Sequence, residues 1–324
     1  HPMTVIVSAT LPPDLLSRVQ ALHTVVQVPA GTPPQEVITE VGRRAEVKGL
    51  LCTLKTRVDE ALLDAFPQLK VVSNYAVGFD NVSVPVVNTR KVLVCNTPGV
   101  LDAAVADLTF GLVLCLARNL VPMHTFVARG TWKTKPAPLA TDLAGKRLGL
   151  LGMGRIGRMV ALRARAFGMA VSYHNRSRDT ASEQSGLASY LERDALFAQC
   201  DFVSVHVPLS DTTRASIGAR ELGLMKPSAF FINTSRGPVV DEPALIAHLQ
   251  QGRIAGAGLD VMVQEPLDGA SPLCHLPNVV LQPHAGSATV ETRRAMIELA
   301  TNNLLDALAG KTPKAMVNPG VWAV

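Results

Sequence analysis

The chain has 324 residues, of which 48% are hydrophobic and 18% charged, and its formal net charge is +5. This composition excludes a disordered chain, and the length exceeds what one hydrophobic core usually supports, so two domains are expected. The arginines gather between Arg155 and Arg178 instead of forming basic tails, which favours a small anionic ligand over nucleic acid as the partner.

The cysteines are odd in number and widely spread. They are Cys52, Cys95, Cys115, Cys200 and Cys274. They show neither a disulfide framework nor the CxxC spacing of a metal site, so we expect no disulfide, no metal and a reducing, cytoplasmic compartment. The first apolar run, residues 5–7, lacks a preceding basic segment, and no apolar stretch reaches membrane-spanning length. The sequence therefore predicts no secretory signal and no membrane partner.

The first hundred residues alternate between short apolar runs and helical patterns. Residues 5–7 predict a strand, and a helical pattern begins at Asp14. Further apolar runs follow at residues 49–52, 61–63, 71–73 and 92–94. Repeated alternation of this kind predicts a parallel, doubly wound sheet.

A long apolar helix is predicted over residues 101–120, and a helix with so many apolar residues is expected to be buried. We place the change of domain at this helix. A second series of strands and helices starts at residues 148–151, and the helical pattern of residues 289–308 is expected to pack back onto the first domain. We therefore predict an α/β protein with two doubly wound parallel-sheet domains. Residues 3–100 and 288–324 form one domain, and residues 101–287 form the other.

The second domain carries a glycine motif between a predicted strand and a predicted helix. Gly152 permits a tight turn, Gly154 lets the backbone approach a pyrophosphate, and Gly157 lets the helix pack closely on the strand. The alternative is that these glycines only form a strand-to-helix turn, but the strand, the helix and the motifs that follow favour a Rossmann-type, dinucleotide-binding domain.

The segment after the next predicted strand indicates which dinucleotide binds. NAD sites usually place an acidic residue about 20 residues after the glycine motif, whereas this chain has Asn175-Arg176-Ser177 there. A carboxylate would repel a 2′-phosphate, while Arg176 and Ser177 can bind one through charge-assisted hydrogen bonds. The sequence predicts that NADPH is preferred over NADH by about ten- to a hundredfold; the alternative is a solvated basic turn.

Three polar residues follow successive predicted strands of the second domain. Arg236 follows residues 229–233, and its planar guanidinium suits recognition of a carboxylate. A reductase also needs a general acid, which we assign to His284, with Glu265 as the carboxylate that orients it. Each residue alone is more typical of a structural role, but three at successive strand ends favour catalysis.

The other histidines have weaker support. We expect His206 beside the cofactor and His174 at the adenosine turn. No motif supports His23, His124, His248 or His275.

Seven motifs together make residues 3–319 resemble the D-isomer-specific 2-hydroxyacid dehydrogenases, and within that family the glyoxylate/hydroxypyruvate reductases and related 2-ketogluconate reductases. They are the segment from Asn74 to Asn81, the glycine motif, His206-Val207-Pro208-Leu209, Asn233-Thr234-Ser235-Arg236-Gly237, Ala257-Gly258-Leu259-Asp260-Val261, Glu265-Pro266 and Pro283-His284-Ala285-Gly286-Ser287.

The resemblance implies a flavodoxin-like substrate domain and an NADP-dependent enzyme that reduces small 2-oxo acids to D-2-hydroxy acids in an interdomain cleft. It also implies a homodimer formed through the cofactor domain, in which the loop carrying Trp132 reaches the active site of the partner. Asp260 is expected to help hold the nicotinamide carboxamide. The expected substrate-binding residues are Leu54, Val77, Gly78, Arg236 and His284. The expected cofactor-binding residues are Gly152, Gly154, Arg155, Ile156, Gly157, Asn175, Arg176, Ser177, His206, Val207, Pro208, Thr213, Thr234, Ser235, Asp260 and Gly286.

Departures from the family pattern narrow the prediction. Asn175 stands where NAD-using relatives carry an acid, and Ala285 stands where isoleucine is common. Formate dehydrogenases carry glutamine at the position of Glu265, and phosphoglycerate dehydrogenases often carry an added regulatory domain, so both are disfavoured. Two alternatives remain open: a phosphite dehydrogenase with the same Arg, Glu and His, and a non-catalytic, dinucleotide-sensing protein like the corepressors that share this fold.

Overall fold

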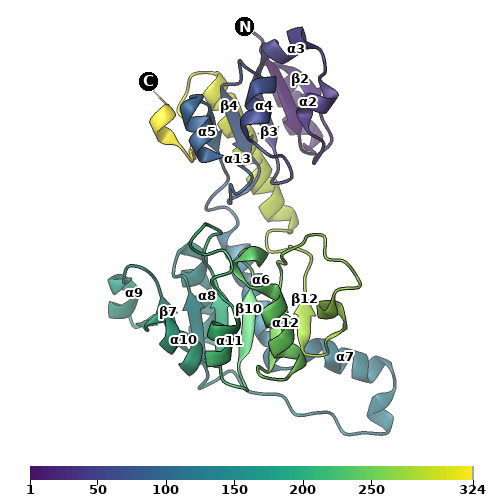
Figure 1. Cartoon of the computed structure of the whole chain (residues 1–324), viewed down its shortest axis with the longest axis vertical. Helices are drawn as coiled ribbons and strands as arrows, with labels where there is room; N and C mark the ends of the chain where they lie inside the picture. The colour runs from purple at the N-terminus through teal and green to yellow at the C-terminus, as the bar shows by residue number, and fades with distance from the viewer. Residues whose placement is uncertain (323–324) are drawn as a thin grey trace. The chain divides into compact units, whose positions relative to one another are not determined.

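The computed structural model describes residues 1–322, and the chain divides into two compact units (Figure 1). Unit 1 contains His1–Leu101 and the segment that begins at Thr289, and unit 2 is the continuous stretch Asp102–Ala288. Both boundaries between the units lie one residue from the domain boundaries predicted from the sequence. The functions assigned to the two units remain predictions.

Unit 1 is built on a five-stranded parallel sheet with the order β2-β1-β3-β4-β5, which is the flavodoxin-like order. Its strands are β1 (Thr4–Ser8), β2 (Thr24–Gln27), β3 (Val47–Cys52), β4 (Val71–Asn74) and β5 (Leu93–Cys95). Its helices are α1 (Pro13–Gln20), α2 (Pro34–Val37), α3 (Val41–Glu46), α4 (Glu60–Ala65), α5 (Val84–Thr89) and α13 (Val290–Leu308), with a 3-10 turn at Pro319–Val321.

The last helix, α13, belongs to unit 1, as the sequence predicts. The Ser73 hydroxyl on β4 donates to the Ala300 carbonyl at 2.6 Å, which ties the helix to the sheet. A Cβ atom on Gly49 of β3 would lie 2.9 Å from the Leu304 side chain, so glycine lets the helix approach the strand closely. Unit 1 is therefore completed by residues from both ends of the described chain.

Unit 2 is built on a seven-stranded parallel sheet with the order β12-β11-β10-β9-β6-β7-β8. Its strands are β6 (Arg147–Leu151), β7 (Ala170–His174), β8 (Ser189–Tyr190), β9 (Phe202–Val205), β10 (Phe230–Asn233), β11 (Gly256–Leu259) and β12 (Val279–Leu281). Strands β6, β7 and β8 follow one another toward one edge of the sheet, and β9 to β12 follow one another toward the other edge. The strand order therefore reverses between β6 and β9, and in Rossmann-type sheets this switch point is where dinucleotides bind. The prediction of two doubly wound parallel-sheet domains is confirmed.

Unit 2 has helices on both faces of this sheet. The helices of the unit are α6 (Asp102–Ala117), α7 (Leu120–Ala128), α8 (Arg155–Ala166), α9 (Thr180–Gln184), α10 (Arg193–Gln199), α11 (Ala219–Leu224) and α12 (Glu242–Gln250), with 3-10 turns at Thr131–Lys133, Gly237–Val239 and Pro272–His275. Two buried clusters lie in unit 2, one including α6 and α8 and the other including α10 and α12.

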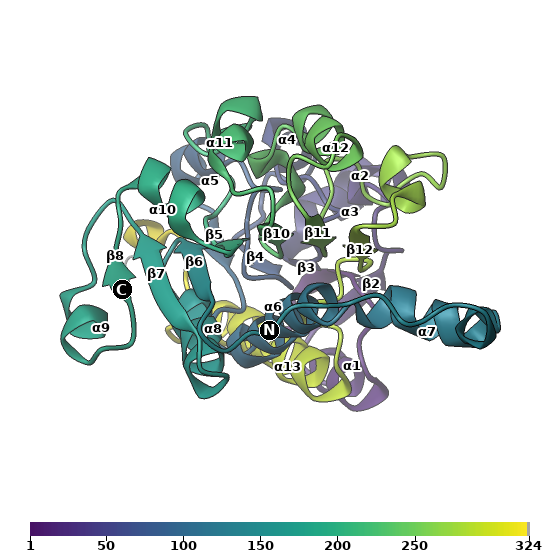
Figure 2. The same cartoon turned by 90° about the horizontal axis from the view of Figure 1, so that it is seen from below.

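The predicted helix over residues 101–120 is two helices. Asn119 adopts a left-handed backbone conformation with φ of +56°, which ends α6 and lets α7 start in a new direction. Many side chains of α6 are buried, whereas no residue of α7 is, and α7 extends away from the body of its unit (Figure 2). Among the described residues no helix alone could cross a membrane; α6 and α7 have the required length and composition only when counted together, and a 58° bend separates them.

Candidate active site

The glycine motif lies at the turn from β6 into α8, between the strand and the helix that the sequence predicts. Gly152 has a φ of +102°, and a Cβ atom there would lie 2.5 Å from the His206 carbonyl oxygen. A Cβ atom on Gly157 would lie 2.7 Å from the Gly152 carbonyl oxygen, while one on Gly154 would meet only open space. The turn therefore packs tightly against the protein and is open at Gly154, where a pyrophosphate needs room, so these residues fit a dinucleotide.

The loop after β9 lies against this turn. The His206 N–H donates to the Leu151 carbonyl at 2.8 Å, and the Thr213 hydroxyl donates to the Pro208 carbonyl at 2.6 Å. Burial lowers the pKa of His206 to about 4, and its Nε2 lies 2.8 Å from the Ser204 hydroxyl. His206 is therefore neutral at pH 7, so its ring can form hydrogen bonds but cannot neutralise a negatively charged group.

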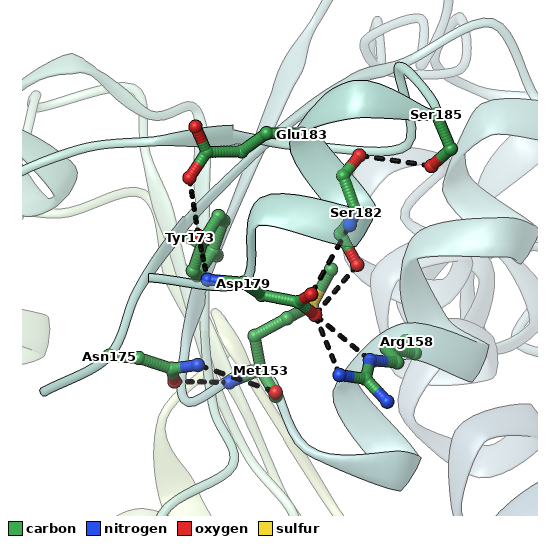
Figure 3. A network of polar contacts seen from close by, with 8 residues as sticks. All are labelled: Met153, Arg158, Tyr173, Asn175, Asp179, Ser182, Glu183 and Ser185. Carbon is green, nitrogen blue, oxygen red and sulfur yellow. Dashed lines mark hydrogen bonds and ion pairs between the residues drawn. The ribbon is translucent and has the colours of Figure 1, made fainter. Parts of the chain in front are cut away.

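The segment after β7 also contacts the glycine turn (Figure 3). The Asn175 Oδ1 accepts from the Met153 N–H at 2.7 Å, so the residue that replaces the usual acid holds the glycine turn. Arg176 and Ser177 are exposed, and an Arg176 Nη2 donates to the Thr212 hydroxyl at 3.1 Å. The Arg176 side chain therefore contacts the loop after β9.

The predicted catalytic residues follow three neighbouring parallel strands. Arg236 follows β10, Glu265 follows β11, and His284 follows β12, so all three lie at the carboxyl edge of one sheet. The His284 Nδ1 lies 2.7 Å from the Glu265 Oε2. Because an ionised carboxylate can only accept, Nδ1 carries the hydrogen, which leaves Nε2 for proton transfer.

The environment of Glu265 keeps it ionised. Burial acts to raise the pKa of Glu265, but hydrogen bonds from His284 and the Met262 N–H, together with the charge of Arg236, outweigh it. The pKa therefore lies below its ordinary value. An ionised Glu265 can orient His284 and stabilise its protonated form.

Asp260 fixes the backbone that carries His284. Its carboxylate accepts from the Ala285 and Gly286 N–H groups at 2.7 and 3.0 Å, and its carbonyl accepts from the His284 N–H. Burial raises the pKa of Asp260 above its usual value despite these hydrogen bonds. His284 itself has a φ of +52°, a conformation uncommon outside glycine and asparagine, so the Asp260 contacts hold a backbone that would otherwise relax.

Asn233 performs the same task for Arg236. Its Nδ2 donates to the Arg236 carbonyl at 3.0 Å, and its Oδ1 accepts from the N–H and the hydroxyl of Ser235. A Cβ atom on Gly237 would lie 1.9 Å from the Met262 carbonyl oxygen, so the chain after Arg236 tolerates only glycine. Thr234 is buried, and its hydroxyl lies 2.7 Å from that of Thr109 on α6.

The predicted substrate-binding residues Val77 and Gly78 lie in unit 1, in the loop after β4. The Val77 carbonyl accepts from the Asn96 side chain at 2.9 Å, and the Gly78 carbonyl accepts from the buried Asn74 side chain at 3.0 Å. No hydrogen bond to the N–H of either residue is made within the described chain. The two amides therefore remain available to an anion, while their carbonyls are fixed.

A hydrogen-bond network of asparagines supports this loop. Asn81 exchanges hydrogen bonds with Asn74 and also donates to the Thr56 carbonyl at 2.9 Å, which joins the loops after β3 and β4. Leu54 lies in the first of these loops and lines a hollow in unit 1 together with Asn81 and Ser83.

Sequence reasoning found the charged residues and missed the residues that hold them. It placed Asn81 and Asn233 in family motifs without giving either a role, and it did not identify Asn96 or the ion pair of Arg158 with Asp179. A usable signal was present for Asn74 and Asn233, since each is a polar residue that ends an apolar strand. The structure brings Glu265 and His284 together directly, and it places Leu54, Val77 and Gly78 in the other unit.

The fold and the strand-end residues define a nicotinamide-dependent dehydrogenase of the two-domain type. Comparison with known proteins gives the family. Residues 110–286 match the family described as "D-isomer specific 2-hydroxyacid dehydrogenase, NAD binding domain". The chain belongs to the D-isomer specific 2-hydroxyacid dehydrogenase family.

Relatives are similar over nearly the whole chain. Glyoxylate/hydroxypyruvate reductase B of Salmonella typhi is 46% identical over 319 residues, which are 98% of each chain. The structure of an NADPH-dependent glyoxylate/hydroxypyruvate reductase from Sinorhizobium meliloti, in complex with NADP and malonate, matches with a TM-score of 0.88 at 34% identity and covers 98% of this chain and 97% of its own. A glyoxylate reductase from Paecilomyes thermophila matches with a TM-score of 0.90 at 31% identity, over 98% and 99% of the two chains.

Proposed function

We propose that this protein is an NADP-dependent glyoxylate/hydroxypyruvate reductase, which converts small 2-oxo acids into D-2-hydroxy acids and prefers NADPH over NADH. The observation that carries the proposal is the His284–Glu265 hydrogen bond of 2.7 Å at the same sheet edge as Arg236. The names of the relatives from Salmonella typhi and Sinorhizobium meliloti support the same substrate class.

In the proposed reaction the bound cofactor supplies the hydride to the carbonyl carbon of the substrate. His284 donates the proton from Nε2 to the carbonyl oxygen as negative charge develops there. Glu265 holds the imidazole in the required tautomer and stabilises the imidazolium before the proton leaves. Arg236 binds the substrate carboxylate and polarises the neighbouring carbonyl through its guanidinium.

The carboxylate of the substrate has a second proposed partner in unit 1. The free N–H groups of Val77 and Gly78 suit an anion, because the asparagine contacts to their carbonyls fix the direction of the peptide planes. Leu54 is proposed to contact the rest of the substrate.

The cofactor is proposed to bind along the edge of the unit 2 sheet, across the point where strand order reverses. The Gly152–Gly157 turn would hold the pyrophosphate, with Arg155 and Ile156 at the start of α8. Arg176 and Ser177 would bind the 2′-phosphate, while Asn175 keeps the turn in place. The nicotinamide end is assigned to the residues that surround the catalytic set, namely Thr234, Ser235, Asp260 and Gly286, and the loop after β9 supplies His206, Val207, Pro208 and Thr213.

The test is the loss of absorbance of the reduced cofactor when the protein is mixed with glyoxylate or hydroxypyruvate. Turnover with NADPH at least about tenfold more efficient than with NADH is expected, because only NADPH engages Arg176. Efficient phosphite-dependent reduction of NADP⁺ would instead identify a phosphite dehydrogenase. Tight cofactor binding without turnover on any 2-oxo acid would favour a sensor protein and overturn the proposal.

We also propose that the protein forms a homodimer through unit 2 and acts in the cytoplasm. Apolar side chains remain exposed on α7 and in the segment after it: Leu120, Val121, Val127, Trp132 and Leu139. An apolar helix without buried residues is expected to pack against a partner surface, and the family resemblance indicates that this partner is a second copy of the chain. Replacing Val121 and Val127 by Glu is expected to convert a dimer into a monomer in light scattering, and a monomeric unsubstituted protein would contradict the proposal.

A further inference from the structure

The segment that carries Arg176 and Ser177 is anchored at both ends (Figure 3). At its start, the Asn175 side chain contacts the backbone of Met153, with Oδ1 accepting at 2.7 Å and Nδ2 donating at 3.4 Å. At its end, the Asp179 Oδ2 accepts from the Arg158 Nε at 2.9 Å and from the Ser182 hydroxyl at 2.7 Å. Both anchors come from the glycine turn or from α8, so the segment is fixed relative to the site of the pyrophosphate.

Asp179 is an acidic residue only three positions from Arg176, and its charge is neutralised. Its side chain is 8% exposed and forms an ion pair with Arg158, while its Oδ1 caps α9 by accepting from the Ser182 N–H. Hydrogen bonds from Ser182, together with the charge of Arg158, lower the pKa of Asp179, so it is ionised at neutral pH. Without Arg158 this carboxylate would repel a phosphate bound to the same segment.

The second acid of the segment is neutralised as well. Glu183 accepts from both the Nε and an Nη of Arg178, at 3.0 and 2.5 Å, and also from the Tyr173 hydroxyl. The Arg178 guanidinium lies 5.0 Å from the centre of the Tyr190 ring, which fixes it further.

The network leaves one guanidinium without a carboxylate partner. Arg158 and Arg178 are engaged by Asp179 and Glu183, whereas Arg176 contacts only the Thr212 hydroxyl within residues 1–322. Arg176 is therefore the arginine of this segment that can exchange its present contact for a phosphate at low cost, because a neutral hydroxyl binds a guanidinium more weakly than a carboxylate does.

We infer that Arg158 is a specificity-determining positioning residue: it neutralises and fixes Asp179, and so lets Arg176 and Ser177 accept the 2′-phosphate of NADPH. The inference rests on the proposed NADPH preference and deepens it. Arg158 acts through Asp179 and does not itself bind the phosphate. The selectivity of this chain then depends on the fourth residue of α8, well outside the three residues that replace the usual acid.

A double-mutant cycle tests the inference, with dissociation constants for NADPH and NADH measured by fluorescence titration of the whole protein. Arg158→Gln is expected to weaken NADPH about tenfold and NADH less than about twofold, because only NADPH carries the phosphate that the released Asp179 charge repels. Arg158→Lys retains the charge and is expected to keep most of the selectivity. Adding Asp179→Asn to Arg158→Gln removes the repulsion while retaining a good helix cap, so NADPH affinity returns to within about threefold of the unsubstituted protein.

Arg163→Gln is the matched control, since Arg163 also lies on α8 and pairs with a carboxylate, the exposed Asp107. It is expected to leave the selectivity unchanged. An equal loss of NADPH affinity from Arg158→Gln in the presence and absence of Asp179→Asn would show direct contact with the phosphate and overturn the inference. Equal weakening of NADPH and NADH would show a purely structural role and do the same. If the unsubstituted protein binds NADPH no better than NADH, the proposed cofactor preference fails together with the inference.

Discussion

The carboxyl edges of the two sheets carry different kinds of binding group. In unit 2, charged side chains extend from successive strand ends, and the pair formed by His284 and Glu265 is held by hydrogen bonds to the backbone. In unit 1, the loop after β4 presents the peptide N–H groups of Val77 and Gly78, and neutral amide side chains fix their carbonyls. In the proposed function, one parallel sheet supports proton transfer through side chains and the other supports anion recognition through backbone N–H groups.

This difference shows what fixes each kind of site. A charged side chain at a strand end is tuned by its neighbours, as the lowered pKa of Glu265 shows. A backbone amide carries no charge to tune, so its orientation is its only adjustable property, and the side chains of Asn74 and Asn96 fix that orientation.

The largest effect is expected from the proton donor of unit 2. His284→Asn removes the acid but retains a polar side chain, and kcat for 2-oxo acid reduction is expected to fall by about 10²- to 10⁴-fold. The dissociation constant for NADPH should change little. His275→Asn is the control, because His275 lies in the same unit and its side chain forms its one hydrogen bond within residues 1–322 with the Gly269 carbonyl. A turnover rate for His284→Asn close to that of the control would refute the assignment of the acid.

A smaller effect is expected from the other strand-end histidine of unit 2. The pKa of His206 is about 4 in the folded protein and 6.5 ordinarily, so the unfolded chain binds a proton that the folded protein does not. The contribution of the neutral His206 to the free energy of unfolding is therefore fully present above pH 6.5 and is lost as the pH falls toward 4. When the pH is lowered from 7 to 5, the free energy of unfolding of the unsubstituted protein should fall by about 1–2 kcal/mol more than that of the His206→Gln variant. Urea denaturation at both pH values measures it, and identical losses in the two proteins would contradict a neutral, buried His206.

The smallest effect is expected from the amide support in unit 1. Asn96→Ala frees the Val77 carbonyl, and the KM for the 2-oxo acid is expected to rise about three- to tenfold, the equivalent of one hydrogen bond. Both kcat and NADPH affinity should stay near their original values, because the variant changes only anion recognition. Asn302→Ala, which removes an amide that contacts Arg18, serves as the control. A fall in kcat with an unchanged KM would show that Asn96 affects the chemical step and not anion binding, and would contradict the difference drawn between the two sheets.

The parts that could be predicted from the sequence are those with a local signal. Alternating apolar runs gave both sheets, and the glycine motif gave the turn at Gly152, because a tight turn and a close approach each need a particular residue at a particular place. The pairing of Glu265 with His284 was predictable in the same way, since each follows a strand of a parallel sheet.

The parts that could not be predicted depend on contacts between distant segments. The break at Asn119 depends on a single left-handed residue within an apolar run, which no periodicity reveals. Asn96 and Val77 are 19 residues apart, and Arg158 and Asp179 are 21 apart, so only the folded sheet brings them together. Val77 and Gly78 were found through family resemblance alone, because a backbone site leaves no characteristic side chain in the sequence.

The position of α13 sets an order for the maturation of the chain during translation. Unit 2 is one uninterrupted stretch that is synthesised before α13, whereas β3 and β4 of unit 1 are synthesised long before the helix that covers them. Until Leu304 and Leu308 arrive, one face of the unit 1 sheet lacks its apolar cover. The segment that forms unit 2 is therefore complete before unit 1 can bury this face of its sheet, because α13 is the helix that covers it.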